Sequence, residues 1–112
     1  MSRDSSLYLV DIVEAIGAIR TYLGGVRASE ALGSNPMARD AVVRNIEIIG
    51  EAVKRLPPDL TCQHPEIDWN GWARLRDVLA HQYFGVDVEL LADAVDEELP
   101  ALERAIAALL SA

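Results

Sequence analysis

The sequence predicts an all-α protein: a compact, antiparallel four- to five-helix bundle formed by one domain, residues 1–112. Apolar residues recur at spacings of three and four in four or five blocks, as in helices with one buried face. No segment shows the apolar–polar alternation between turn residues that is typical of strands. Proline and paired glycines separate the blocks at short intervals, so successive helices are expected to pack antiparallel.

The first helix is expected to end at about Leu23, because the glycine pair 24–25 follows. Segment 26–35 resembles a loop in which residues 27–32 could add one helical turn. The side chains that could cap the start of this helix are those of Asp4, Ser5 and Ser6. Its predicted buried stripe consists of Leu9, Ile12, Ile16, Ile19 and Leu23.

A second helix is expected to begin at Asn35-Pro36, with asparagine as the cap and proline in the first turn. Pro57-Pro58 ends it. Gly50 lies inside this helix at a cost of about 1 kcal/mol relative to alanine, which indicates close approach of another backbone. The predicted buried stripe is Val42, Ile46, Ile49, Val53 and Leu56.

After an irregular stretch, Asp68 is expected to cap a third helix over residues 69–83. Residues 84–87 resemble a turn, and a fourth helix follows over residues 88–97, capped by Asp87. Pro100 fits the first turn of a fifth helix, residues 99–110, better than the middle of one long helix. The inward-facing residues of the third helix are predicted to be Trp72, Leu75 and Leu79.

The composition indicates a soluble, cytoplasmic protein. With 51% hydrophobic and 25% charged residues, the chain of 112 residues is typical of a globular domain. Acidic residues interrupt the N-terminal apolar segment, so neither a signal peptide nor a membrane-spanning helix is expected. The one cysteine, Cys62, excludes an internal disulfide and a cysteine-based zinc site. No cofactor and no metal are expected.

The formal net charge of −8 argues against a broad nucleic-acid footprint, because phosphate contacts usually require a basic surplus. It is compatible with a small site at which a few cations gather, or with a basic protein partner.

Residues 72–87 gather the side chains that could carry chemistry. Asp77 and His81 lie four positions apart, about 40° around an ideal helix, so the carboxylate could hold one imidazole nitrogen. Arg76 and His81 are five apart, about 140° around the helix, and would not face the same point. They could converge if the helix ends near His81, or if two subunits share the site across a two-fold axis; we expect both.

Taken one at a time, these residues have ordinary structural interpretations. His81 could simply cap a helix C-terminus, where a cation suits the helix dipole. Arg76 could be a surface arginine paired with an acid, and Tyr83 a boundary aromatic. His64, before a proline in a loop, is most simply structural. Spacing alone therefore leaves the function undecided.

The segment nevertheless resembles a known family. Arg76, His81 and Tyr83 match the Arg-x4-His-x-Tyr motif of the HepT-like toxins in the HEPN superfamily. The likeness extends to DAVVRNIEIIGEA at 40–52, HPEIDW at 64–69, YFGVD at 83–87 and the closing DEELPALERAI, and so covers nearly the whole chain. Asparagine often follows the motif arginine in these proteins, whereas this chain has Asp77, an acid that would repel phosphate unless it orients His81.

The resemblance implies a homodimer whose motif helices face each other across a cleft, and metal-independent cleavage of RNA. In that scheme Arg76 and His81 are catalytic, and Asp77 supports them. The implied partner is an MntA-like nucleotidyltransferase antitoxin that transfers AMP from ATP to Tyr83 and so silences the toxin. The residue types agree with this chemistry, because RNA carries its own 2′-hydroxyl nucleophile, histidine transfers protons near neutral pH and arginine binds phosphate.

Two alternatives from other classes remain at this point. The chain could be a catalytically inactive helical module that only binds a nucleotidyltransferase, which Asp77 and the acidic charge would favour. It could also be a plain structural dimer.

Overall fold

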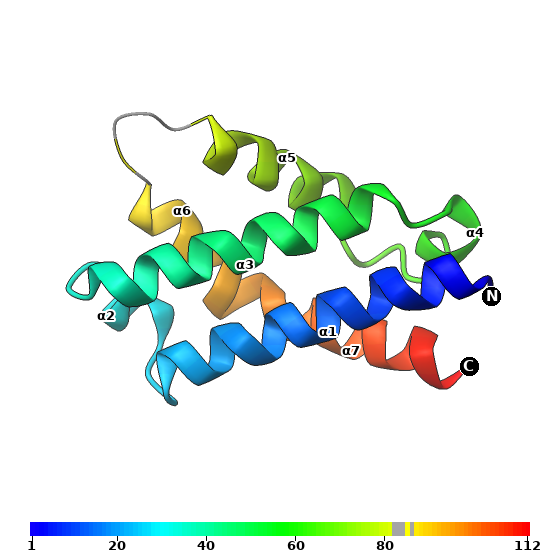
Figure 1. Ribbon diagram of the computed structural model, residues 1–112, viewed down its shortest axis with the longest axis horizontal. Coiled ribbons are helices and arrows are strands. Elements are labelled where there is room, and N and C mark those ends of the chain that lie inside the picture. The colour runs from blue at the N-terminus through cyan, green and yellow to red at the C-terminus, as the bar shows by residue number, and fades with distance from the viewer. Residues whose placement is uncertain (82–84, 86) are drawn as a thin grey trace.

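The computed structural model describes residues 1–81, 85 and 87–112, and within them the chain is helical with no strand (Figure 1). The all-α prediction is confirmed. Four long helices form the body of the protein: α1 (Arg3–Leu23), α3 (Pro36–Lys54), α5 (Trp69–Ala80) and α7 (Leu99–Ser111). Short helical segments connect them: α2 (Ala28–Ala31), α4 (Pro58–Thr61), α6 (Val88–Asp93) and the π-helical turn η1 (Ala94–Glu98).

Successive long helices run in opposite directions, as expected for an antiparallel bundle. Helix α3 lies between α1 and α5 and packs extensively against both, whereas α7 packs against α1 (Figure 1). The two chain ends lie at the same end of the bundle, and the last turn of α5 and the start of α6 lie at the opposite end. No helix among the described residues is long and apolar enough to span a membrane.

The apolar stripes form one core. Their large side chains are nearly all inaccessible to solvent, and each such aliphatic residue contributes about 1.5–3 kcal/mol on burial. Leu23 is only partly buried, at the edge. The residues of the predicted stripes that the core contains are Leu9, Ile12, Ile16, Ile19, Val42, Ile46, Ile49, Val53, Leu56, Trp72, Leu75 and Leu79.

Polar caps begin the main helices largely where the sequence predicts them. Asn35, Asp68 and Asp87 each accept a hydrogen bond from the backbone N–H three residues later, which supplies an acceptor to an otherwise unpaired donor. The predicted cap of α1 is wrong, because Ser2 takes that role and accepts from the backbone N–H of Ser5. The helix begins this early because Ser5 is already buried and belongs to its inner face.

The connections differ more from expectation. Helix α4 forms in the stretch predicted to be irregular, because Pro58 also suits the first turn of a helix. Between Val88 and Ser111 the chain stays helical with no loop. Leu99 donates its N–H to the carbonyl of Ala94, and this widened π turn accommodates Pro100, which lacks a donor and crowds the preceding turn.

Candidate functional site

Gly50 brings helix α5 close to helix α3 where the motif begins. A Cβ atom at this position would overlap the Cβ of Arg76 and lie 2.9 Å from the carbonyl oxygen of Trp72. The close approach that the glycine predicted is therefore present, and its neighbour is the motif arginine. Because Gly50 has no Cβ, α5 can pack close to α3, and the Arg76 side chain extends over α3 from this short separation.

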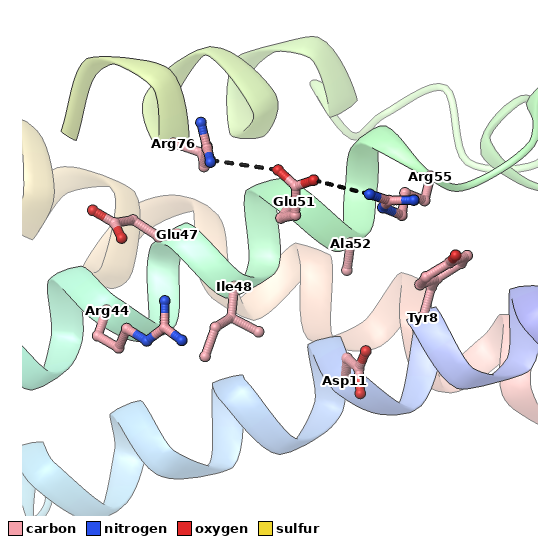
Figure 2. Close-up of a pocket in the computed structure, with 9 residues that line it drawn as sticks. All are labelled: Tyr8, Asp11, Arg44, Glu47, Ile48, Glu51, Ala52, Arg55 and Arg76. Carbon is pink, nitrogen blue, oxygen red and sulfur yellow. Dashed lines mark hydrogen bonds and ion pairs between the residues drawn. The ribbon is translucent and has the colours of Figure 1, made fainter. Parts of the chain in front are cut away.

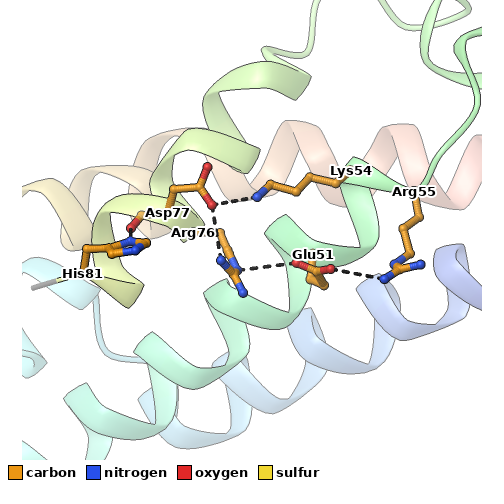
Figure 3. A network of polar contacts seen from close by, with 6 residues as sticks. All are labelled: Glu51, Lys54, Arg55, Arg76, Asp77 and His81. Atoms are coloured by element: carbon orange, nitrogen blue, oxygen red, sulfur yellow. Dashed lines mark hydrogen bonds and ion pairs between the residues drawn. The ribbon is translucent and has the colours of Figure 1, made fainter.

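The guanidinium of Arg76 lies between two carboxylates (Figure 3). Its Nε is 3.5 Å from Oε2 of Glu51 on α3, and its Nη1 donates to Oδ1 of Asp77 at 3.3 Å. The side chain is 33% exposed, so solvent still reaches part of it. Glu51 also contacts Arg55 at 3.5 Å, which extends the network along α3.

Asp77 pairs with cations and not with the imidazole. Its Oδ1 accepts a hydrogen bond from Nζ of Lys54 at 2.6 Å as well as the bond from Arg76. The hydrogen bond from Lys54, with the charges of Lys54 and Arg76, holds the pKa of Asp77 below its ordinary 3.8. The predicted contact between this carboxylate and His81 is wrong, because Lys54 lies across the helix interface within reach of the side chain.

His81 contacts residue 77 through the main chain instead. Helix α5 ends at Ala80, and His81 follows as its cap with φ −107° and ψ 10°. Nδ1 of the exposed ring lies 2.7 Å from the carbonyl oxygen of Asp77. Since a carbonyl oxygen can only accept, Nδ1 carries the hydrogen, and in the neutral ring Nε2 holds the free lone pair.

The structure thus connects two of the three motif residues, Arg76 and His81, through Asp77. Arg76 contacts the side chain of Asp77, and His81 contacts its backbone. Among the described residues, Arg76 and His81 form no hydrogen bond with each other. The helix ends before His81, which is one of the two arrangements that the spacing required. The prediction that this helix extends to residue 83 is wrong, because α5 ends at Ala80; Tyr83 itself lies outside the described residues.

A groove of about 310 Å³ opens beside Arg76 between helices α1 and α3 (Figure 2). Sequence reasoning singled out only one of its residues, Arg76. The others are recognisable afterwards as one face of α3, at spacings of three and four, opposite one face of α1. Besides Arg76, the lining residues are Tyr8, Asp11, Arg44, Glu47, Ile48, Glu51, Ala52 and Arg55.

His64 lies apart from this network. Its ring nitrogen faces Glu66 at 3.0 Å, and its carbonyl accepts a hydrogen bond from the indole of Trp69. Both contacts fit the structural interpretation of this histidine. Among the described residues, no group of three or more His, Cys, Asp and Glu side chains is arranged to hold a metal ion.

Comparison with known proteins assigns the chain to a family. Residues 12–109 match the family described as ribonuclease HepT-like, a range that includes all of the contacts above from α3 and α5. The chain belongs to this family. The resemblance that the Arg-x4-His-x-Tyr motif indicates is thereby confirmed.

Three HepT-like relatives cover most of the chain. A "probable ribonuclease HepT" of Thermococcus cleftensis is 44% identical over 103 residues, 92% of this chain and 93% of the relative. A "putative RNase" of Methanocaldococcus jannaschii is 39% identical, covering 88% of this chain and 80% of the relative. One of Caldanaerobacter subterraneus subsp. tengcongensis, also a "putative RNase", is 40% identical over 68% of both chains. No solved structure matches the chain.

Proposed function

We propose that the chain is a ribonuclease in which Arg76 binds the scissile phosphate and His81 transfers the proton. The observation that carries this proposal is the 2.7 Å hydrogen bond from Nδ1 of His81 to the backbone of Asp77. It fixes one tautomer and leaves Nε2 for a substrate, which is the requirement for a general base or acid. Membership of the ribonuclease HepT-like family supports the same activity.

The chemistry balances with these groups alone. His81 takes the proton from a 2′-hydroxyl, the 2′-oxygen forms a bond to phosphorus, and the bond from phosphorus to the 5′-oxygen breaks. A protonated imidazole returns a proton to that 5′-oxygen, which leaves a cyclic phosphate and a 5′-hydroxyl. Arg76 stabilises the additional negative charge on the phosphoryl oxygens, an effect worth about 3–4 kcal/mol for comparable donors. No step uses a metal, so the proposed reaction is metal-independent.

We extend the proposal to a homodimer with the two motif helices facing each other. A two-fold axis would bring Arg76 of one subunit beside His81 of the other, two side chains that lie about 140° apart around a single ideal helix. Val78 lies one turn before His81 on the same face of α5, and its side chain is 44% exposed. An apolar residue beside the exposed imidazole suits burial against its own copy.

Substitution of the two catalytic residues tests the activity. We expect Arg76→Ala and His81→Ala to lose at least about 100-fold in RNA cleavage measured in EDTA, the range expected for one transition-state donor. Arg74→Ala is the matched control, since Arg74 lies on the same helix but its side chain is 70% exposed and pairs with Asp68. Equal cleavage by the parent and His81→Ala would refute the catalytic assignment.

Mixing the two inactive variants tests the shared site. If Arg76 of one subunit works with His81 of the other, a mixed dimer of Arg76→Ala and His81→Ala chains contains one intact site. Random assortment then restores about one quarter of the parent activity, because half of the dimers are mixed and half of their sites are intact. No recovery after co-refolding would show that each site belongs to a single subunit.

We also propose that the chain is the toxin of a toxin–antitoxin pair. Its partner would be an MntA-like nucleotidyltransferase that transfers AMP from ATP to Tyr83. Because Tyr83 follows His81 by two residues, the bulky anionic adduct would compete with RNA for the same cations. Intact mass spectrometry after incubation with the antitoxin and ATP should show AMP on the parent and none on Tyr83→Phe.

The inactive helical module remains the second candidate. The observation that favours it is the pairing of Arg76 with both Glu51 and Asp77, which neutralises the cation that would bind phosphate. Under that proposal the protein binds the nucleotidyltransferase but does not cleave RNA in any buffer. The cleavage assay with Arg76→Ala and Arg74→Ala therefore separates the two candidates.

A further inference from the structure

We propose that the groove between α1 and α3 is a subsite for single-stranded RNA, in which Arg44 and Arg55 bind phosphates and Tyr8 stacks on a base. The proposal rests on the proposed ribonuclease function, because it places the substrate strand that leads to Arg76. Arg44, Arg55 and Arg76 all line this groove (Figure 2). The subsite would hold RNA beside the scissile phosphate, with no part in the bond-breaking step.

The charged residues of α3 that line the groove follow the periodicity of the helix. Arg44, Glu51 and Arg55 lie at spacings of seven and four, so they project from one face of the helix toward α1. The eleven positions from Arg44 to Arg55 span about 16 Å along the helix axis. That length corresponds to about five stacked nucleotides at roughly 3.4 Å each, so the groove suits a short strand better than a mononucleotide.

Arg44 and Arg55, at the two ends of the groove-lining part of α3, differ in the ion pairs that they form. Arg44 is exposed and has no ion-pair partner within the described part of the chain. Arg55 contacts Glu51 at 3.5 Å while its side chain is 57% exposed, and such an exposed pair is worth less than about 1 kcal/mol. A phosphate can therefore recruit both guanidinium groups at small cost.

Tyr8 supplies an aromatic surface at the end of the groove that contains Arg55. It is partly buried against the core, and the guanidinium of Arg55 lies 6.0 Å from the centroid of its ring. A fixed aromatic ring next to an arginine is the usual arrangement for sequence-tolerant recognition of an unpaired base, where stacking contributes about 1–3 kcal/mol. A duplex would not present its bases to this ring.

The charge of the groove is less unfavourable to a polyanion than the net charge of the whole chain. Its three arginines balance its three acids, Asp11, Glu47 and Glu51, so its lining is neutral in a chain of net charge −8. The hollow near Arg20 and Arg27 is also neutral, but both of its arginines are paired with acids, it has no counterpart of the unpaired Arg44, and it has no aromatic residue. The groove beside Arg76 is thus the better place for a polyanion.

Binding of an uncleavable strand tests the subsite independently of catalysis. The probe is a fluorescein-labelled 2′-O-methyl-RNA 12-mer of mixed sequence, titrated by fluorescence anisotropy at several salt concentrations. We expect Arg44→Gln and Arg55→Gln each to weaken binding severalfold and to lower the slope of log K against log salt by about 0.7. Tyr8→Phe should bind like the parent, and Tyr8→Leu about tenfold more weakly.

Arg20→Gln is the matched control, because it also breaks an exposed arginine–glutamate pair but lies outside the groove. Parent-like affinity and salt slope in both Arg44→Gln and Arg55→Gln would overturn the subsite, as would equal binding of a duplex probe. Circular dichroism checks that each variant keeps its helices. In a cleavage assay the groove variants should raise KM and keep kcat, whereas failure of the parent to cleave RNA would refute the ribonuclease proposal and leave the binding result interpretable.

Discussion

Replacement of Gly50 by alanine offers a quantitative test of the packing that positions Arg76. Alanine improves helix propensity by about 1 kcal/mol, but its Cβ would overlap the Cβ of Arg76 and press on the carbonyl of Trp72. Relieving that overlap means separating α3 and α5, and overpacking of this kind costs about 1–3 kcal/mol. The net change is therefore a loss of up to about 2 kcal/mol in the free energy of unfolding.

Gly17 provides the control, because it also lies inside a helix and a Cβ there would meet nothing within 4 Å. Gly17→Ala should stabilise the protein by about 0.5–1 kcal/mol. Since both substitutions share the propensity gain, the difference between them measures the steric cost, about 1–3 kcal/mol in urea denaturation. A difference below about 0.5 kcal/mol, the usual error of additivity, would refute the close approach of α5.

Two further predictions concern polar contacts. Asp96→Ala should lower the free energy of unfolding by about 1.5–3 kcal/mol, because its carboxylate accepts from the backbone N–H groups of Ala28 and Ser29 at 2.8 and 2.9 Å. Glu103→Ala, which breaks only an exposed pair, should cost less than about 1 kcal/mol in the same denaturation, and an equal loss would contradict the capping role. Lys54→Gln should raise the pKa of Asp77 toward 3.8, followed by NMR of its carboxyl carbon. Since Lys54 lowers the pKa of Asp77, the stability that this pair contributes is present above pH 3.8 and is lost as the pH falls through the folded-state pKa. The parent should therefore lose more stability than Lys54→Gln on acidification. An unchanged pKa of Asp77 in Lys54→Gln would refute the pairing.

Gly50 also shows what kind of feature the sequence can predict. Its unfavourable place inside a helix indicates close packing, and a cap such as Asn35 or Asp68 indicates where a helix begins. The caps are local signals, because the residue and the helix start lie within a few positions along the chain, whereas Gly50 indicates close packing without identifying its neighbour on α5. The fold class and most helix starts follow from such signals.

The contacts of the candidate site depend on the register between helices, which local patterns do not contain. Lys54 and Asp77 are 23 residues apart, and only the packing of α5 on α3 makes them partners. Sequence spacing correctly allowed Asp77 to approach His81, but the lysine across the interface takes the carboxylate and leaves the backbone carbonyl for the imidazole. Pro100 correctly indicated the first turn of α7, but the π turn that joins α7 to α6 without a loop was not predicted by local spacing.

If Arg76 binds the scissile phosphate as we propose, the same network explains how an acidic protein can present a site for RNA. In the free protein Arg76 already has two anionic neighbours, Glu51 and Asp77, which hold its guanidinium in place at the edge of the groove. A phosphate that binds there exchanges one set of anions for another, so affinity depends on the difference between two ion pairs and not on net charge. Asp77 also pairs with Lys54, so its charge would remain compensated if a phosphate displaced it from Arg76. In the proposed mechanism, the carboxylate next to the motif arginine is then part of the arrangement that keeps the cation oriented for substrate.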